Sequence, residues 1–599
     1  MYTTVNDIKQ TIIPTTAFKG LNYNEEIGQG EFSEAINMDN EDYPVLKSHP
    51  THAITKDYGS DIWAMAQRGD SIWYVDDGFL YRDDGSGVKY NPTAFSLGSH
   101  YFVNMGAYLI LFPEGFYVNT ENTTEKGYIN RSYNTGNTST SFTLCKQDGT
   151  AYATPIVSND EPDNPDNGDL WIDTTQTPHM LKQWSSTSAM WVEIPTVYCK
   201  IANTGIGSGL KMYDSVEISG IVASGSPIED QLNFLNGTMI VYDCGNDYIV
   251  VAGIIDQTAT LTDDIHVDMT MPEMDYVCEA NNRLWGCKYG IVNGKAINEI
   301  YASKLGDFRN WKNYMGLSTD SYAVSVGTDG YFTGCVNYLG YPIFFKENCI
   351  HKIYGQLPSN FQVQTTMARG VKANCFGSLC IIDEVLYYQS PVDFVRYDGS
   401  LPQKVSDALG DLYVWASCCG NVNGILHMGC IISTDINRGD ESAAYFTYDP
   451  KMGIWQRWDV GEDTTARFWC NWYGIPGYLR IDGKMCCMEP IDGENYTYIP
   501  TKWELKSGRM TFGDDQNTMK LLKVTVRMRI AQKAFVKAYV EYDDDGVWNL
   551  SREFRAGKLG TYILPIFIKK CDHVRIKLKG EGNVSIFQIN QVYVEGANR

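Results

Sequence analysis

The stretch DIWAMAQRGDSIWYVDDGFLYRDD, residues 61–84, decides the fold class. Its runs of Trp, Tyr, Phe, Val and Ile are broken at RGD, residues 68–70, and at DDG, residues 76–78. Aromatic and β-branched residues favour strands, while Gly and Asp supply the backbone conformations that tight hairpins need. The stretch therefore predicts three strands joined by two turns.

The same pattern returns along the chain. Residues 99–119 repeat it, and further copies follow after residue 271. The units recur roughly 40–55 residues apart, which is the spacing of β-propeller blades with four strands each. Trp311 and Trp455 lie near the ends of two units and are predicted to pack between neighbouring blades, with carbohydrate stacking as the alternative. We therefore expect a β-propeller.

Two changes of composition divide the chain. Between residues 123 and 271 Thr, Ser, Asn and Gly become frequent, and the segment predicts small β modules inserted into the propeller, because a loop insertion costs little. From about residue 499 apolar and polar residues alternate cleanly, which predicts an antiparallel β-sandwich. The predicted fold is all-β, with an N-terminal arm (1–55), the first part of a β-propeller (56–122), inserted β modules (123–271), the remainder of the propeller (272–498) and a C-terminal jelly-roll-like β-sandwich (499–599).

Charge is unevenly distributed. The chain has 72 acidic and 49 basic residues, a net charge of −23, yet residues 501–599 carry 18 basic and 11 acidic ones. An acidic surface disfavours tight wrapping of nucleic acid. It suits either a surface that DNA passes without adhesion or one that meets a basic partner. The basic C-terminal part could serve as a docking face, and ordinary surface charge explains it equally well.

Neither cysteine spacing nor hydropathy indicates a metal site or a membrane segment. The 16 cysteines lack zinc-ligand spacing, so we expect buried, reduced thiols and assembly in a reducing cytoplasm. The first 20 residues lack a signal-peptide pattern, and no apolar run is long enough to span a bilayer. Membrane insertion is therefore not expected.

The titratable residues do not form a catalytic motif. The eight histidines are dispersed, and no nucleophile elbow, zinc-protease motif or phosphate-binding loop is present. His49 and His52 are close in sequence, but no third metal ligand is near. Most acidic residues fall in turns, which explains them without chemistry. We expect no enzymatic activity, no cofactor and no metal; a propeller glycosidase with paired carboxylates is kept as a third hypothesis.

The segment NDEPDNPDNGDLWIDTTQTPHMLKQW, residues 159–184, is the strongest candidate for a metal loop. A calcium loop of EF-hand type that starts at Asp163 would place Pro165 and Thr174 at positions that need ligands. The EF-hand interpretation therefore fails, while a looser surface calcium site stays open.

A small β module explains the same segment better. Trp171, Trp184 and Trp191 alternate with polar residues, so they can share one face of a three-stranded sheet. A sheet this small needs large aromatic side chains for a core. The three tryptophans are therefore predicted to form the core of the module, and glycan binding is the alternative role for them.

Several segments resemble bacteriophage proteins. Residues 164–194 show Gly-Asp-Leu-Trp, Asp-Thr, Pro, Leu-Lys, Trp and Trp-Val in this order, and resemble a short module that recurs in tail and tail-fibre proteins. The start AFKGLNYNEEIGQGEFSEAINMDNEDYPVLKSHP, residues 17–50, resembles that of the nozzle proteins of short-tailed phages and of propeller-containing stabilization proteins in phages of gut Firmicutes. The segment EANNRLWGC, residues 279–287, in a predicted blade, and the terminal segment KKCDHVRIKLKGEG, residues 569–582, are similar to the stabilization proteins.

The resemblance covers most of the chain and implies a structural component of a bacteriophage virion, assembled in the host cytoplasm. It implies part of an oligomeric tail or nozzle ring that conducts DNA and holds neighbouring tail proteins. The implied partners are further copies of the chain, neighbouring tail or connector proteins, and genomic DNA that passes without specific binding. The N-terminal arm and the sandwich would contact neighbouring subunits. One departure is His49, which stands where a second basic residue often follows Lys47.

A second function is compatible with the same resemblance. The chain could be a receptor-binding tail protein that recognises host surface glycan through the inserted modules, residues 123–271. Exposed tryptophans on the modules would favour this alternative.

Overall fold

The computed structural model describes residues 10–49, 52–435, 439–459, 465–472, 475–488, 497–499, 502–511, 519–566, 571 and 573–595. Besides strands, these residues contain one α-helix, α1 (Glu229–Asn233), and three short 3-10 segments, η1 (Pro358–Asn360), η2 (Phe376–Ser378) and η3 (Asp407–Leu409). No helix in these ranges is long and apolar enough to cross a bilayer. The same residues divide into two compact units: unit 1 takes 10–99, 344–351 and 365–595, and unit 2 takes 100–343 and 352–364.

The opening stretch forms the antiparallel sheet that its sequence predicts. Its strands are β7 (Ile62–Arg68), β8 (Ser71–Asp76) and β9 (Phe79–Arg82). Asp76 pairs with Phe79 across a turn whose central residues are Asp77 and Gly78. Both have positive φ, 45° and 76°, a conformation that Asp and Gly adopt at low cost. Local turn chemistry therefore fixes this hairpin.

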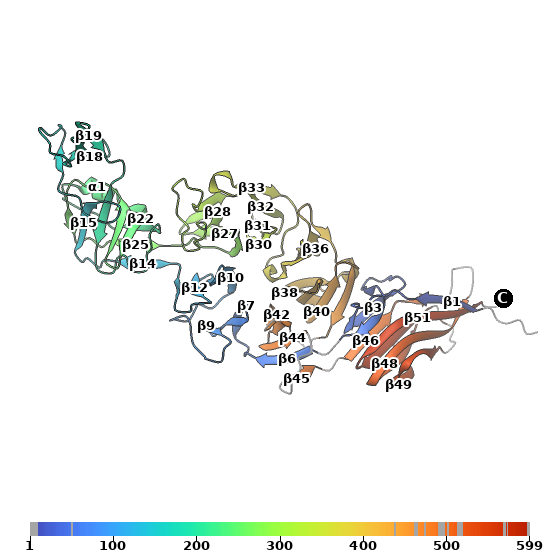
Figure 1. The fold of residues 1–599 in the computed structure, drawn as a ribbon. Coiled ribbons are helices and arrows are strands. Elements are labelled where there is room, and N and C mark those ends of the chain that lie inside the picture. Colours follow the sequence, from blue (N-terminus) through green and yellow to red (C-terminus); the bar gives the residue numbers. More distant parts are fainter. Residues whose placement is uncertain are drawn as a thin grey trace, which may run out of the picture. The chain divides into compact units, whose positions relative to one another are not determined.

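Five further sheets of the same kind follow among the described residues, and a sixth four-stranded set, β38–β41, is continuous with a larger 15-stranded sheet (Figure 1). Their strands are β10 (Tyr101–Met105), β11 (Tyr108–Phe112), β12 (Phe116–Asn119) and β13 (Lys126–Tyr128); β26 (Tyr276–Ala280), β27 (Arg283–Val292), β28 (Lys295–Ala302) and β29 (Tyr322–Ser325); β30 (Phe332–Tyr338), β31 (Tyr341–Lys346), β32 (Cys349–Tyr354) and β33 (Gln362–Thr366); β34 (Cys380–Ile382), β35 (Val385–Gln389), β36 (Phe394–Tyr397) and β37 (Gln403–Lys404); β38 (Tyr413–Val422), β39 (Ile425–Ser433), β40 (Ser442–Asp449) and β41 (Ile454–Trp458); and β42 (Ala466–Trp472), β43 (Ile475–Arg480), β44 (Lys484–Cys487), β6 (His52–Asp57) and β45 (Thr497–Ile499). A succession of such small antiparallel sheets is typical of propeller blades.

Both blade-ending tryptophans pack where the sequence predicts. Trp311 is 3% exposed and belongs to a core cluster with Phe112 of β11 and Val277 of β26, so it lies between two neighbouring sheets. Trp455 of β41 is 1% exposed and meets Phe394 of β36 edge to face, with ring centroids 6.0 Å apart. The predicted packing role of both residues is confirmed.

The inserted segment of unit 2 forms two sheets. The larger one has the order β14-β25-β21-β22-β23-β20-β15-β24, and the smaller one runs from β16 to β19. The bounds are β14 (Arg131–Asn134), β15 (Thr140–Cys145), β20 (Tyr198–Ala202), β21 (Ser215–Ser219), β22 (Gly237–Gly245), β23 (Tyr248–Ala252), β24 (Ala259–Leu261) and β25 (His266–Met269), with β16 (Ile156–Ser158), β17 (Leu170–Asp173), β18 (Met180–Ser185) and β19 (Met190–Glu193) in the smaller sheet. The smaller sheet has four strands where the sequence predicts three, because β16 adds in parallel to β17.

The two ends of the chain share one sheet in unit 1, which continues into β38–β41 because β3 also pairs with β41. The N-terminal strands are β1 (Gln10–Thr15), β2 (Gly20–Leu21), β3 (Glu31–Ile36), β4 (Met38–Asp39) and β5 (Leu46–Ser48), and the C-terminal ones are β46 (Lys502–Ser507), β47 (Met510–Thr511), β48 (Met519–Tyr542), β49 (Asn549–Pro565), β50 (His573–Glu581) and β51 (Val584–Glu595). Strand β1 pairs with β51, and β3 pairs with β46 (Figure 1). The described part of the predicted arm therefore completes the C-terminal domain of its own chain.

The arm also changes the charge of this domain. Residues 10–49 carry seven acidic and two basic side chains, which offset most of the basic excess of residues 501–599. The predicted basic docking face therefore has acidic strands in the same sheet. Residues 1–9, 50 and 51 of the predicted arm lie outside the described residues, as do residues 569, 570 and 572 of the terminal segment.

The long hairpin β48–β49 folds back on itself and so produces a curled sheet. The first half of β48 pairs with β51 and its second half with β50. The two halves of β49 meet where Ser551 donates its hydroxyl hydrogen to the carbonyl oxygen of Pro565 at 3.0 Å, and where Phe554 contacts Tyr562 with centroids 5.0 Å apart. The predicted all-β fold, with propeller blades interrupted by inserted modules and followed by an antiparallel sandwich, is confirmed.

Two buried histidines, His52 on β6 and His427 on β39, flank the indole of Trp458 in unit 1. Their ring centroids lie 5.3 and 4.8 Å from that of Trp458. Burial lowers the pKa of His52 to about 4 and the pKa of His427 to about 3. Both imidazoles are therefore still neutral at pH values where the unfolded chain takes up protons.

Acidification is expected to destabilise unit 1 through these histidines. In the folded chain the pKa values of both histidines lie below the ordinary value of 6.5. The stability that the two histidines contribute is therefore complete above pH 6.5 and is lost as the pH falls towards 4 and 3. Each histidine lowers the free energy of unfolding by about 1.4 kcal/mol per pH unit in this window. Between pH 6.5 and pH 5, the His52→Phe variant should therefore lose about 2 kcal/mol less than the native chain in denaturant titrations.

The comparison with the variant also removes the effect of two carboxyl groups. Burial raises the pKa of Asp39 to about 6 and raises the pKa of Glu34, so these groups stabilise the folded chain as the pH falls. They are present in both proteins, and their contributions cancel in the difference. Equal losses of stability in the native chain and the variant would contradict the prediction.

Candidate functional site

The three predicted tryptophans of the small module meet in one cluster. Trp171 lies on β17, Trp184 on β18 and Trp191 on β19, and the last two pair directly across the strands. Trp191 contacts both others edge to face, with ring centroids 5.5 Å apart in each case. The structure thus brings together all three residues that the sequence singled out.

Trp171 is the buried member of this cluster. It is 5% exposed, and its indole nitrogen donates to the carbonyl oxygen of Ser158 at 3.1 Å. The ammonium group of Lys182 lies 4.6 Å from the Trp171 ring centroid and 2.8 Å from the carboxylate of Asp173. The hydrogen bond from Lys182 lowers the pKa of Asp173 to about 2. Trp171 therefore offers no free ring face for a sugar, and a glycan role stays a prediction for the half-buried Trp184 and Trp191.

The acidic loop before β17 is built from turns. The backbone N–H of Asp166 donates to the carboxylate of Asp169 at 2.8 Å, and Gly168 takes a positive φ of 97°. The side-chain oxygen of Asn167 accepts a hydrogen bond from the backbone N–H of Ser186 at 2.9 Å. In the part of the chain that the structure describes, no group of three or more His, Cys, Asp or Glu side chains is placed to hold a metal ion.

Replacing Trp171 by alanine is expected to destabilise the small module, β16 to β19, by about 3–5 kcal/mol, the usual cost of removing a large buried aromatic side chain. Hydrogen exchange of peptides from residues 156–193 in the full chain should show the loss. The matched control is Trp184→Ala, which removes a half-buried ring with a smaller effect. Equal effects at both positions would mean that the cluster is not the core of the module.

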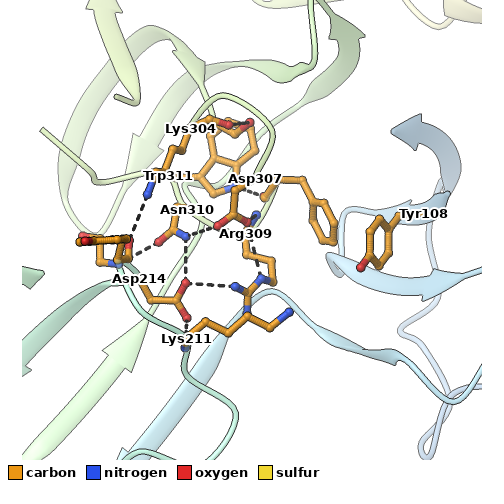
Figure 2. A network of polar contacts seen from close by, with 12 residues as sticks. Tyr108, Lys211, Asp214, Lys304, Asp307, Arg309, Asn310 and Trp311 are labelled. Atoms are coloured by element: carbon orange, nitrogen blue, oxygen red, sulfur yellow. Dashed lines mark hydrogen bonds and ion pairs between the residues drawn. The ribbon is translucent and has the colours of Figure 1, made fainter. Parts of the chain in front are cut away.

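A second polar site joins the larger inserted sheet to the sheet β26–β29 within unit 2. We call it the joint and define it as residues 211–215, which lead into β21, and residues 304–313, which follow β28. At its centre is Asp214, whose side chain is 1% exposed. Figure 2 shows its carboxylate between the side chains of Arg309 and Asn310 and the backbone of Lys211.

Hydrogen bonds satisfy both carboxylate oxygens of Asp214. Arg309 Nη2 and Asn310 Nδ2 each donate to Oδ1 at 3.0 Å, and the backbone N–H of Lys211 donates to Oδ2 at 2.8 Å. The Arg309 side chain is 12% exposed, so the ion pair is largely withdrawn from water. A buried charge pair of this kind is stable only while both partners remain.

Neighbouring groups hold the central residues of the joint in place. Asn310 accepts a hydrogen bond from the backbone N–H of Ser215 at 2.8 Å and donates to Asp307 at 2.5 Å. Asp307 also accepts from the backbone N–H of Arg309 at 3.0 Å. Lys304 donates to the carbonyl oxygen of Tyr213 at 3.3 Å. Both segments therefore contribute backbone and side-chain groups to one network.

The joint extends to the sheet β10–β13. Tyr108 on β11 lies beside the joint (Figure 2). Its ring lies 4.9 Å from that of Phe308, and its hydroxyl donates to Glu125 at 2.6 Å. Burial, followed by the bond to Glu125, raises the pKa of Tyr108 to about 12. The same hydrogen bond lowers the pKa of Glu125. Three separate stretches of unit 2 are thereby tied together.

The two segments of the joint, and the loop that continues the second one, carry several exposed apolar side chains. We call this set the joint surface. Its members are Met212, Tyr213, Leu305, Tyr314, Met315 and Leu317, each between 38% and 59% exposed. Tyr and Met are enriched in the cores of protein interfaces, and a gathering of exposed apolar side chains marks an interaction site.

The sequence did not reveal the joint. The segment GDFRNWKNY, residues 306–314, was expected only to end a blade, and Asp214 was not singled out. The two partners, Asp214 and Arg309, are 95 positions apart. No periodic pattern or spacing connects residues so distant in the chain, so only the folded structure shows that they meet.

Glycoside hydrolases are among the solved structures that match the chain. No family model matches the chain, and no curated protein matches it. An exo-β-1,3-galactanase from Phanerochaete chrysosporium, solved with β-1,3-galactotriose, is 10% identical, with 53% of this chain and 95% of that chain covered and a TM-score of 0.20. An arabinoxylan arabinofuranohydrolase of glycoside hydrolase family 43 from Bacillus subtilis is 9% identical, with coverages of 70% and 93% and a TM-score of 0.17.

These matches correct one prediction. The sequence led us to expect that the chain is not an enzyme, and this prediction is wrong on the comparison, because the matched proteins named above and a third, a glycoside hydrolase with a TM-score of 0.15, are enzymes.

Proposed function

We propose that the chain is a structural component of a bacteriophage virion and forms part of an oligomeric ring in the tail or nozzle. Such a ring would conduct DNA and hold neighbouring tail proteins. Its partners would be further copies of the chain and adjacent tail or connector proteins.

The joint is the observation that carries the assembly part of the proposal. It fixes an inserted module to a blade through the buried pair Asp214–Arg309, and the joint surface exposes six large apolar side chains. A rigid, apolar and aromatic surface is suited to subunit contact, because little conformational entropy is lost on binding. A neighbouring subunit that covers it would remove these side chains from water.

The virion part of the proposal is supported by the sequence. The Gly168-Asp169-Leu170-Trp171 signature and the N-terminal segment, residues 17–50, carry the resemblance to phage tail proteins. The charge of −23 also suits a wall along which DNA moves, since an acidic surface repels the phosphate backbone. Both features are expected of a protein that guides a genome without holding it.

Two measurements test this proposal. Native mass spectrometry and negative-stain electron microscopy of the purified full chain should show a closed ring of several copies. Antibodies against the chain should label one axial position on phage particles in electron micrographs. A chain that stays monomeric at all concentrations and never co-purifies with virions would refute the proposal.

A further inference from the structure

Three sulfur atoms from three different strands meet in unit 1. The Sγ atom of Cys470 on β42 lies 3.6 Å from the Sδ atom of Met65 on β7 and 3.9 Å from the Sδ atom of Met485 on β44. We call these three residues the sulfur cluster. It is separate from the joint and from the tryptophan cluster, both of which belong to unit 2.

The sulfur cluster belongs to a small apolar core. Its neighbours there include Ile62 on β7 and Leu479 on β43. Met485 is fully buried, whereas Cys470 and Met65 keep 5% and 8% of their surface exposed. The cluster therefore lies close beneath the protein surface, in surroundings that supply no charge to balance that of a bound ion.

The ligand types of the cluster are those that soft metal ions prefer. Thiolate and thioether sulfur atoms bind Cu(I) and similar ions, whereas Mg(II) and Ca(II) prefer oxygen ligands. The thiol of Cys470 is free, since it takes part in no disulfide bond. One thiol and two thioethers thus offer three soft ligands from three strands.

The separations between the sulfur atoms match those of ligands around one ion. A bond between a metal ion and a sulfur ligand is about 2.3 Å long, so three sulfur atoms in one plane around an ion lie about 4 Å apart. The distances of 3.6 and 3.9 Å from Cys470 to the two thioethers are close to this value. An ion bonded to Cys470 therefore needs only small side-chain movements to reach Met65 and Met485.

We propose that the sulfur cluster binds one soft monovalent metal ion, Cu(I) or its chemical analogue Ag(I). On binding, the S–H bond of Cys470 breaks, a bond between sulfur and metal forms, and the proton leaves to solvent. Met65 and Met485 coordinate the ion through sulfur lone pairs, and no electron is transferred. One thiolate balances one positive charge, so the occupied site is neutral within its apolar surroundings.

The same charge balance disfavours divalent ions. Zn(II) bound to one thiolate and two thioethers would leave one positive charge in an apolar core, which costs free energy. The next thiol on this face, Cys487, is separated from Cys470 by Gly477, which pairs with both residues. Two strand spacings of about 4.8 Å place the backbones of the two cysteines roughly 10 Å apart. A second thiolate is therefore not part of the cluster.

Metal binding at the cluster is coupled to proton release. Burial raises the pKa of Cys470 to about 12, so its thiol is protonated at neutral pH. An ion that replaces this proton releases one proton per site, and its affinity should rise about tenfold for each pH unit. A release of two protons per ion would indicate a second thiolate ligand and contradict the proposal.

Anaerobic competition between the reduced full chain and the chelator bathocuproine disulfonate, with Cu(I) as the probe, tests the proposal. The native chain should take one equivalent of Cu(I) from the chelator. Met65→Leu removes one ligand but keeps the volume of the side chain, so it should weaken this binding at least about tenfold without unfolding the chain. Cys470→Ser should abolish the binding. The matched control is Cys430→Ser, which alters a buried thiol on β39 of the same unit and should leave the affinity unchanged.

Two further readouts make the test decisive. X-ray absorption of the Cu(I)-loaded chain should show three sulfur neighbours at about 2.3 Å. Cu(I) should raise the thermal midpoint of the native chain but not that of Cys470→Ser, because an ion that binds only the folded state stabilises it. No bound equivalent, unchanged affinity in Met65→Leu, nitrogen or oxygen neighbours of the ion, or tighter binding of Zn(II) than of Cu(I) would each overturn the proposal.

Discussion

Replacing Asp214 by alanine should lower the stability of unit 2 by about 3–5 kcal/mol. The substitution removes the carboxylate that the largely buried guanidinium of Arg309 hydrogen-bonds, leaving Asp307 at 3.5 Å as its counter-charge, and it removes one of the two acceptors of Asn310. A buried charge that loses its hydrogen-bonded partner costs more than the ion pair contributed, because the charge has already been taken out of water. Hydrogen exchange of peptides 211–215 and 304–313 in the full chain measures the loss.

A matched control lies between strand β21 and the same loop. Glu217 and Lys312 form an ion pair of 3.8 Å whose side chains are 44% and 42% exposed. Exposed pairs contribute roughly 0–1 kcal/mol, so Glu217→Ala should leave exchange almost unchanged. A double variant, Asp214→Ala with Arg309→Ala, should recover part of the loss, because it also removes the buried charge that has lost its main partner. If Asp214→Ala were no more damaging than Glu217→Ala, the joint would not hold the inserted module.

The second large effect concerns assembly. Replacing Met212 and Leu317 together by aspartate should weaken ring formation at least about a hundredfold, since burying each new carboxylate in a subunit contact costs several kcal/mol. Both side chains belong to the joint surface and are 50% and 54% exposed, so the fold of the single chain should tolerate the change. Analytical ultracentrifugation across a range of concentrations measures the shift from ring to monomer.

The control for assembly is Phe234→Asp. Phe234 is 70% exposed and follows helix α1 in the same unit, outside the joint surface. It carries the same change of charge and hydropathy on an apolar exposed side chain. Equal weakening by Phe234→Asp and by the double variant, or no weakening by either, would show that the joint surface is not the subunit contact.

Local sequence pattern was sufficient for the blades and the tryptophan cluster. The alternation of residues 61–84 and the Asp77-Gly78 turn predict β7 to β9, because strand and hairpin preferences act between residues close in the chain. Trp171, Trp184 and Trp191 gather because alternation places them on one face of neighbouring strands. These features needed no information about distant contacts.

The pairing of the two chain ends could not be predicted in this way. Strand β1 begins at Gln10 and pairs with Val594 of β51, so the partners are separated by nearly the whole chain. Strand preference shows that each segment is extended, but it does not specify which edge the segment joins. The sequence-based division therefore separated an arm from a sandwich, whereas the described strands of both share one sheet.

By itself, the sequence determined the all-β class, the blade repeats, the insertion and the tryptophan cluster, because turn chemistry and side-chain alternation are set by neighbouring residues. Only the tertiary structure decided that Asp214 meets Arg309, and that Cys470 meets Met65 and Met485. These contacts join residues from separate strands and loops, and their strength depends on burial, which a single chain segment cannot provide. The candidate sites of this protein therefore arise from the way its sheets and loops are brought together.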